Sequence, residues 1–355
     1  MRAAVYRGPG SVSVEDYPDP ADPGPGELTL EISRAAICGT DASEWRHGPL
    51  LARPPVVLGH EFTGTVVATG GAAVTGGSAA TGTGAATFQP GDRLVCGAGV
   101  SCGQCEWCTA GRTNLCASYR TFGLHVNGGL ARYVTVPQAI CLPVPSGVTA
   151  TAAAMAQPLA VALHAVRRSG LQPGQACAVV GAGGIGAFVV AAAAACGASP
   201  LIAFDIDDSR LDTAKRLGAH QARNVRGTDL AEAILAETGG AGAQVVIEAT
   251  GTAMAPAAAI AGTRRGGTVL LVGLQAAPRE LNLFDLTARE ITITTTLAHV
   301  CDTDLPQALQ VLAERPLADI VLDRVIPLDD LVSGGLQPLA DGTAQGKIVV
   351  GTGAA

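Results

Sequence analysis

The chain has 355 residues, which is long enough for two domains that each bury a core. Its 23 basic and 30 acidic residues give a formal net charge of −7, and Lys215 and Lys347 are the only lysines. Nucleic acid and anionic membrane surfaces bind clustered Lys and Arg, so neither is an expected partner. The longest apolar run, Ile185–Cys196, is shorter than the roughly 20 residues that span a membrane.

The first residues and the cysteines indicate the cellular compartment of the protein. The first ten residues, MRAAVYRGPG, contain no apolar segment like that of a secretory signal peptide, so a cytoplasmic location is expected. Disulfides rarely persist in that compartment. Of the ten cysteines, four lie between Cys102 and Cys116, and this density indicates a bound metal.

Residues 1–155 are predicted to form a β-rich domain, because short apolar runs alternate with Gly and Pro clusters. The expected strands are Leu28–Ile32, Val56–Leu58, Thr63–Val67, Arg93–Val95 and Ala131–Val136. Residues 70–87 consist only of Gly, Ala, Thr, Ser and Val. Because these residues offer few side chains that can pack, the segment is predicted to be a mobile surface loop.

Residues 156–296 are predicted to form a doubly wound parallel sheet of the Rossmann type, because near-continuous apolar strands alternate with helices. The expected strands are Ala176–Val180, Leu201–Phe204, Val245–Ile247, Thr268–Val272 and Ile291–Thr295, and the expected helices are Gly184–Cys196, Asp208–Leu217 and Asp229–Glu237. Residues 297–355 lack this alternation and are expected to return to the first domain.

A glycine-rich loop, Gly181-Ala-Gly183-Gly184-Ile185-Gly186, joins the first of these strands to the first helix. Its glycines permit a tight turn, a close approach to a pyrophosphate and close helix–sheet packing. Asp205 ends the next strand 19 residues later, near the ~20 expected for a carboxylate that binds the ribose hydroxyls of NAD. A carboxylate repels the 2′-phosphate of NADP, whereas Arg210 on the following helix would soften that preference.

Two groups of residues are candidate zinc ligands. Cys102, Cys105, Cys108 and Cys116 have the spacing of a closed four-thiolate site, which leaves no position for substrate and is therefore expected to be structural. Cys38, His60 and Glu61 offer one thiolate, one imidazole and one carboxylate. Three protein ligands leave an open position on the metal, which is the pattern of a catalytic site.

These residues together resemble the zinc-dependent medium-chain dehydrogenases/reductases, in particular the sorbitol, 2,3-butanediol and threonine dehydrogenase branch. The matching motifs run nearly from end to end: Cys38-Gly-Thr-Asp41, Gly59-His-Glu61, Gly91-Asp-Arg93, the four cysteines with Asn114-Leu-Cys116, Gly128–Tyr133, Gln157–His164, the Gly181 loop and Gly346–Val350. The resemblance implies that the β-rich domain is GroES-like and catalytic, and that the chain forms a homodimer or homotetramer.

The resemblance also implies a reaction. A secondary alcohol (a vicinal diol, polyol or cyclitol) binds the zinc as its alkoxide, and its hydride passes to the nicotinamide of NAD⁺. Thr40 matches the hydroxyl that accepts the alcohol proton. An amino-alcohol substrate, such as threonine or an aminocyclitol, is the alternative within the same family, and a zinc- and NAD-binding sensor without turnover is the alternative outside enzymes.

Two positions depart from that branch. Gln157 stands where a glutamate usually lies at or near the zinc, so Glu61 is the carboxylate expected to complete the metal shell. Ser43 stands where relatives commonly carry the histidine that passes the proton to water. Glu44, His47 or a water molecule is then expected to take over that step.

Overall fold

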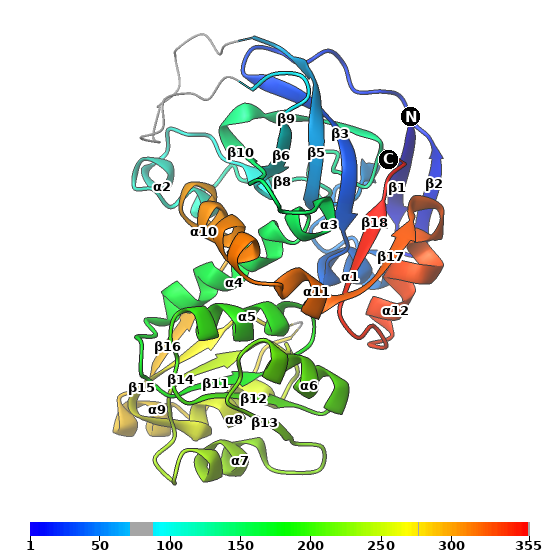
Figure 1. Cartoon of the computed structure of the whole chain (residues 1–355). Helices are drawn as coiled ribbons and strands as arrows, with labels where there is room; N and C mark the ends of the chain where they lie inside the picture. The colour runs from blue at the N-terminus through cyan, green and yellow to red at the C-terminus, as the bar shows by residue number, and fades with distance from the viewer. Residues whose placement is uncertain (72–87, 276, 354–355) are drawn as a thin grey trace. The chain divides into compact units, whose positions relative to one another are not determined.

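The computed structural model describes residues 1–71, 88–275 and 277–353, so residues 72–87 of the predicted loop lie outside the described residues. The chain divides into two compact units (Figure 1). The first combines Met1–Ala160 with His299–Ala355, and the second is Val161–Ala298.

The first unit is built on a seven-stranded sheet in the order β10-β6-β5-β3-β18-β17, with β9 paired to β3. A three-stranded sheet, β2-β1-β4, and a β7-β8 pair complete it. The strands are β1 (Arg2–Gly8), β2 (Ser11–Asp16), β3 (Glu27–Ala36), β4 (Val56–Val57), β5 (Glu61–Thr69), β6 (Arg93–Cys96), β7 (Gly99–Val100), β8 (Arg120–Thr121), β9 (Tyr133–Pro137), β10 (Cys141–Pro143), β17 (Leu322–Pro327) and β18 (Lys347–Gly351).

Buried apolar side chains hold this sheet together. Leu28, Leu30 and Ile32 alternate along β3 and pack with Phe62 and Val66 of β5 in one core. The strand β18, from the end of the chain, lies between β3 and β17. The final segment therefore returns to the first unit and fills the interior of its sheet.

Short helices flank the sheet. They are α1 (Gly39–His47), α2 (Glu106–Thr109), α3 (Ala150–Ala153), α10 (Cys301–Glu314), α11 (Leu317–Val321) and α12 (Gln337–Ala340), with 3₁₀ turns η1 (Thr113–Leu115), η2 (Gln138–Ile140) and η3 (Leu328–Asp330) and a π turn η4 (Leu331–Leu336). At the start of α1, Asp41 accepts the backbone N–H of Cys38 at 2.9 Å. This capping bond fixes the end of β3 against the first turn of the helix. Helix α4 (Ala156–Ser169) begins in this unit.

The second unit is a six-stranded parallel sheet in the order β13-β12-β11-β14-β15-β16. Its strands are β11 (Cys177–Val180), β12 (Leu201–Asp205), β13 (Gln221–Asn224), β14 (Ala243–Glu248), β15 (Thr263–Leu271) and β16 (Thr292–Thr295), and its helices are α5 (Gly184–Ala195), α6 (Asp208–Arg216), α7 (Leu230–Glu237), α8 (Ala255–Gly262) and α9 (Leu283–Arg289). Figure 1 shows α5 and α6 on one face of this sheet and α7 and α8 on the other. The predicted doubly wound Rossmann fold is thus confirmed.

The strand order reverses between β11 and β14, which is where open α/β sheets bind ligands. Apolar side chains from both strands pack against α7 and α8, as Val180 and Val246 do with Ile234 and Ile260. Thr268–Leu271 pairs on both sides within β15, because β16 continues the sheet and forms its edge.

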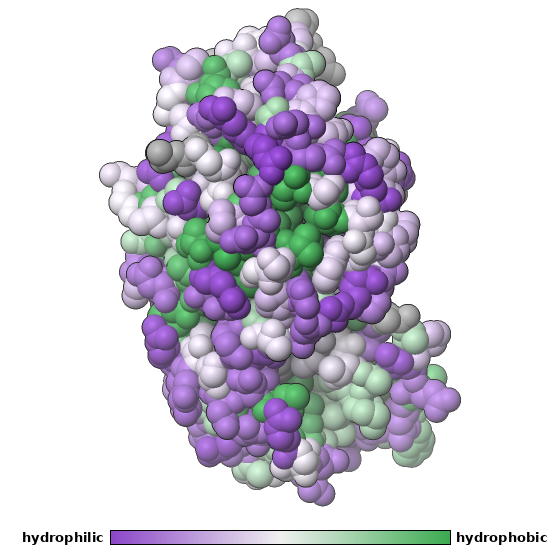
Figure 2. All heavy atoms as spheres, turned by 90° about the vertical axis from the view of Figure 1, so that its right-hand side faces the viewer, coloured by the Kyte–Doolittle hydropathy of each residue, from purple (hydrophilic) through white to green (hydrophobic). Residues whose placement is uncertain are grey.

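No helix of the described residues is long and apolar enough to cross a membrane. Figure 2 views the molecule from the side on which Figure 1 draws β2, β17 and α12. On that face, separate hydrophobic patches interrupt a mainly hydrophilic surface.

Candidate active site

Cys38, His60 and Glu61 come together because β3 and β5 are antiparallel neighbours. Ala36 pairs with Glu61, so Cys38, two residues past Ala36, lies beside the start of β5. One ligand atom from each of the three side chains lies within 4.8 Å of the others. Gly59, with φ of +100°, precedes them in a tight turn where a Cβ atom would lie 2.7 Å from the backbone nitrogen of Leu130. The turn therefore requires glycine.

The charges around these side chains fit a divalent cation. His60 is buried, and its Nδ1 lies 3.7 Å from Oδ1 of buried Asp41, beyond hydrogen-bond distance. Burial lowers the pKa of His60, but the negative charges of Asp41, Cys38 and Glu61 outweigh it and raise the pKa to about 10. A site that draws a proton so strongly onto an imidazole has an excess of negative charge, which a bound metal ion would neutralise.

Lys347 is a further member of this site that the sequence analysis did not single out. Its Nζ atom forms an ion pair with Oε2 of Glu61, and both side chains are buried. Burial lowers the pKa of Lys347, but the charges of Glu61 and Cys38 outweigh it, so the pKa is raised. The sequence indicated this role only through a single lysine at the start of the apolar run Ile348–Val350. A buried ammonium without a partner would be energetically unfavourable there.

The residues predicted for proton transfer lie on or near α1. The Oγ1 atom of Thr40 is 3.6 Å from Sγ of Cys38. Glu44 is buried and accepts the backbone N–H groups of Leu50 and Leu51, at 2.9 and 2.6 Å, so its carboxylate holds the turn after the helix. His47 and Ser43 are exposed on α1.

Gln157 is far from α1 in the sequence. It is buried in the first turn of α4, a part of that helix belonging to the first unit.

The four cysteines of the second candidate metal site form a compact cluster around α2 and η1. Their sulfur atoms lie within 4.8 Å of one another, with Cys102 and Cys108 3.9 Å apart and Cys105 and Cys108 3.5 Å apart. Tetrahedral zinc with Zn–S bonds of about 2.3 Å places its sulfurs about 3.8 Å apart. The spacing therefore fits a zinc–tetrathiolate.

The pKa values of these thiols also fit a bound zinc ion. Backbone N–H groups of Gln104 and Cys105 lower the pKa of Cys102 to about 6. Burial raises the pKa of Cys108 to about 11. A buried thiol beside a thiolate is stabilised when both bind one cation, because the cation favours the deprotonated form of each.

The glycine-rich loop of the second unit lies at the reversal of the strand order. A Cβ atom on Gly186 would lie 1.9 Å from the carbonyl oxygen of Gly181, so α5 packs directly on the loop that precedes it. Gly183 occupies the N-cap position of α5 and has no side chain to cap it. The first N–H groups of Gly184, Ile185 and Gly186 are therefore available for an anion, as in dinucleotide-binding loops.

Asp205 ends β12 and anchors the loop. Its Oδ2 accepts the N–H of Ala182 at 2.7 Å, and its Oδ1 accepts those of Ile206 and Asp207 at 2.7 and 3.1 Å. A carboxylate has about four acceptor sites, so one remains for a ribose hydroxyl. The guanidinium of Arg210 lies 3.2 Å from where a Cβ atom of Gly183 would be, and thus borders the same loop.

Glu248 is a second buried carboxylate at the reversal point, and the sequence analysis did not name it. It ends β14 and accepts the N–H groups of Thr250 and Gly251 at 2.6 and 3.0 Å. These bonds fix the turn that faces the glycine-rich loop. The two segments are close, because a Cβ atom on Gly181 would lie 2.6 Å from the side chain of Thr250. A charged residue at the carboxyl end of a buried strand was the available signal.

Comparisons with known proteins agree with this arrangement. Residues 24–146 match the alcohol dehydrogenase GroES-like domain and residues 184–314 match the zinc-binding dehydrogenase domain. The chain is 34% identical to the sorbitol dehydrogenase of Bos taurus over 323 residues, which are 88% of this chain and 85% of that one. The chain belongs to the zinc-binding alcohol dehydrogenase family of oxidoreductases, and the predicted GroES-like domain is confirmed.

Two solved structures have the same fold over nearly the whole chain. One is 2R,3R-butanediol dehydrogenase from Bacillus subtilis, with a TM-score of 0.87, 28% identity and 99% coverage of both chains. The other is a zinc-binding dehydrogenase from Sinorhizobium meliloti bound to NADP, with a TM-score of 0.87, 31% identity and coverage of 99% of this chain and 98% of that one.

Proposed function

We propose that this protein oxidises a secondary alcohol, of the vicinal diol, polyol or cyclitol class, to the corresponding ketone with NAD⁺ as hydride acceptor. The observation that carries the proposal is the cluster of Cys38, His60 and Glu61, which has the donor set of a catalytic zinc site. Similarity to sorbitol and butanediol dehydrogenases supports the substrate class and does not favour an amino alcohol.

The side chains of the first unit prepare the alcohol for oxidation. When bound, zinc supplies Lewis acidity that lowers the pKa of a substrate hydroxyl. The thiolate of Cys38, the imidazole of His60 and the carboxylate of Glu61 would hold the zinc ion. Thr40, close to Cys38, accepts the hydroxyl proton, and exposed His47 or water passes it to solvent. Gln157 adds no charge, which leaves Glu61 as the anionic oxygen ligand.

The second unit holds the cofactor. The N–H groups at the start of α5 bind its pyrophosphate, and Asp205 accepts a hydrogen bond from its ribose. The carboxylate disfavours a 2′-phosphate, while Arg210 attracts one. We infer a preference for NAD⁺ over NADP⁺, because Asp205 is buried at the loop itself.

The test is NADH formation by the zinc-replete protein with butane-2,3-diol, sorbitol, xylitol, myo-inositol and threonine. Oxidation of a diol, polyol or cyclitol with two zinc ions per chain is the expected result. Faster oxidation of threonine than of the other four substrates would show that the protein is an amino-alcohol dehydrogenase. Tight NADH binding without oxidation of any of the five would contradict a dehydrogenase of this substrate class.

We also propose that the chain forms a homodimer or homotetramer through the edge of the second unit. The strand β16 ends the sheet, and Leu274, Leu283 and Phe284 are 76%, 69% and 82% exposed. Large exposed apolar side chains beside an open sheet edge favour association. Light scattering tests the proposal, since Phe284→Glu is expected to give monomers and a monomeric unaltered chain would contradict it.

A cytoplasmic location is the remaining part of the proposal. None of the ten cysteines, all of which lie in the described residues, forms a disulfide, a state that reducing compartments maintain. Fractionation of cells that express the chain, with detection by antibody, tests it. Recovery in a secreted or membrane fraction would contradict it.

A further inference from the structure

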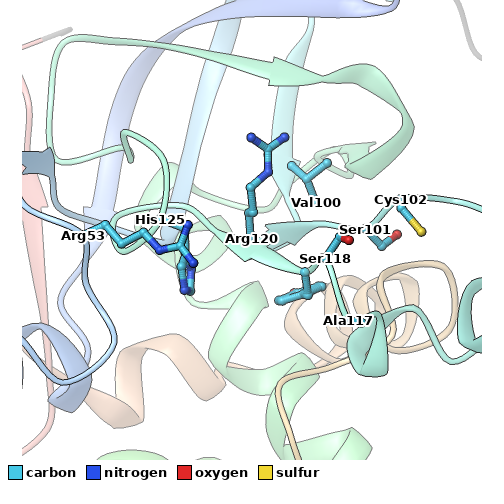
Figure 3. A pocket seen from close by; sticks show the side chains of 9 residues that line it. Arg53, Val100, Ser101, Cys102, Ala117, Ser118, Arg120 and His125 are labelled. Carbon is cyan, nitrogen blue, oxygen red and sulfur yellow. The ribbon is translucent and has the colours of Figure 1, made fainter. Parts of the chain in front are cut away.

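A pocket of about 390 Å³ opens in the first unit beside the four-cysteine cluster. Its lining includes Arg53, Arg120, His125, Ser101, Ser118 and Cys102. Figure 3 shows Arg120 between the Arg53 and His125 side of the pocket and the Ser101 and Cys102 side. Its volume is within the range of small-molecule sites.

Two guanidinium groups in this pocket carry uncompensated positive charge. No described residue forms an ion pair or side-chain hydrogen bond with Arg53 or Arg120, and no Asp or Glu lines the pocket. Two guanidinium groups that line one pocket without a carboxylate beside them form a binding surface for an anion.

The third basic side chain, His125, is held as a donor. Its Nδ1 accepts the backbone N–H of Thr121 at 3.0 Å, so the neutral ring carries its proton on Nε2. Burial and the charges of Arg53 and Arg120 lower its pKa, with Glu44 opposing them.

The pocket adjoins the segment that carries the candidate metal ligands. A Cβ atom on Gly123 would lie 2.5 Å from the backbone nitrogen of Gly59, and Phe122 contacts the ring of Phe62 edge-on at 5.9 Å. Gly59 and Phe62 flank His60 and Glu61 in sequence. The chain between Arg120 and His125 thus packs directly on the segment that supplies two of the three ligands.

We propose that this pocket binds the anionic group, a carboxylate or a phosphate, of a polyhydroxy alcohol whose hydroxyl is oxidised at the Cys38, His60 and Glu61 centre. The inference rests on the proposed function and narrows its substrate class from neutral polyols to acidic ones. Arg53 and Arg120 supply the charge, and His125 and the hydroxyls of Ser101 and Ser118 supply further donors. Guanidinium groups match the planar or tetrahedral oxygen arrangement of both anions.

The experiment compares three six-carbon substrates with the zinc-replete full chain and NAD⁺: D-sorbitol, D-gluconate and D-sorbitol 6-phosphate. We expect kcat/KM for one acidic substrate to exceed that for sorbitol at least tenfold, and the favoured one identifies the anion as carboxylate or phosphate. In the double variant Arg53→Gln/Arg120→Gln the ratio of acidic to neutral kcat/KM falls at least tenfold. The double variant Arg53→Lys/Arg120→Lys, which keeps the positive charge, is expected to retain part of the preference for the acidic substrate.

Arg112→Gln is the matched control, because Arg112 lies over the ring of Trp107 in the same lobe and does not line the pocket. Its substrate ratio is expected to equal that of the unaltered chain. Circular dichroism and thermal unfolding confirm that each variant is folded. An equal fall in Arg112→Gln would attribute the effect to net charge and overturn the proposal.

Calorimetric titration of the same zinc-loaded protein with D-gluconate and with inorganic phosphate separates this inference from the proposed function. If sorbitol is oxidised but neither acidic substrate is preferred and neither anion binds, the pocket assignment fails and the proposed function stands. If no alcohol is oxidised while anion binding depends on Arg53 and Arg120, the proposed function fails and the pocket is an anion site without a role in oxidation.

Discussion

Lys347 and Glu61 form a buried ion pair although almost the whole chain lies between them. Their strands, β18 and β5, flank β3 on opposite sides in the sheet. The ammonium thus holds one oxygen of the carboxylate that stands beside Cys38 and His60. This contact makes the C-terminal strand a part of the candidate metal site.

Removing the ammonium leaves a buried carboxylate without a partner. We expect Lys347→Met to lower the free energy of unfolding of the zinc-free protein by about 3–5 kcal/mol, and Glu61→Gln/Lys347→Met to recover part of the loss. Urea unfolding measures both. Lys215→Met, at an exposed pair with Asp212, is the control and changes stability by less than about 1 kcal/mol. A similar small effect at Lys347 would contradict a stabilising ion pair.

The same pair predicts a pH dependence. The pKa of Lys347 is raised above its ordinary value of 10.5 in the folded protein. Its stabilisation is therefore fully present below pH 10.5 and is lost only as the pH rises through the higher folded value. The stability difference between the unaltered chain and Lys347→Met is expected to be constant between pH 7 and 9, and a difference that falls over that range would contradict the raised pKa.

The catalytic metal assignment depends on Cys38. We expect Cys38→Ser to reduce bound zinc from two ions to one per chain and to lower NADH formation by more than about 100-fold, since even indirect metal contacts cost 10- to 100-fold. NADH binding, which involves the second unit, remains. Cys196→Ser, at a half-buried thiol on the second unit, is the control and keeps both ions. Zinc content and steady-state rates are the measurements.

The four-cysteine cluster is expected to stabilise rather than to catalyse. Cys116→Ser removes one ligand, so a zinc ion is lost and the melting temperature falls, by about 2–4 °C for each kcal/mol in a domain of this size. The remaining ion stays at Cys38. Loss of activity without a change in melting temperature would contradict the structural role.

Asp205 anchors the glycine-rich loop and is the residue proposed to bind the ribose of the cofactor. Asp205→Ala removes three backbone hydrogen bonds and the negative charge, so the KM for NAD⁺ is expected to rise about tenfold while discrimination against NADP⁺ weakens. Asp208→Ala, at an exposed carboxylate on the neighbouring helix, serves as the control. An unchanged ratio of the two cofactors' kcat/KM values would refute the ribose role.

The sheet of the second unit was predictable from sequence because its strands are buried on both faces. Val179 and Ile202 lie in continuous apolar runs, and such runs occur in parallel sheets covered by helices. The strand β13 was missed because it lies at the edge and its residues, Gln221–Asn224, are mostly polar and half-buried or exposed. Helices α8 and α9 were missed because Pro, Gly and Ala at α8 and a single short turn pattern at α9 carry no clear helical periodicity.

The metal ligands of the candidate site were predictable from residue type and spacing, including Cys38, which is distant in sequence from His60 and Glu61. His60 and Glu61 are adjacent, and the four cysteines lie within one short segment, so their types and spacing indicate metal binding. The partner of Glu61 is set by the pairing of β18 with β3, which no local pattern encodes. The bonds that occupy Glu44 likewise depend on the fold of the turn at Leu50 and Leu51.

The position of β18 between β3 and β17 also governs the order in which the protein matures on the ribosome. Residues 161–298 are contiguous, so the second unit has all of its strands before β18 is synthesised. The first unit must wait until β18 has left the exit tunnel. Until then Glu61 has no ammonium beside it, so a stalled nascent chain would carry a finished nucleotide-binding unit and an unfinished metal centre.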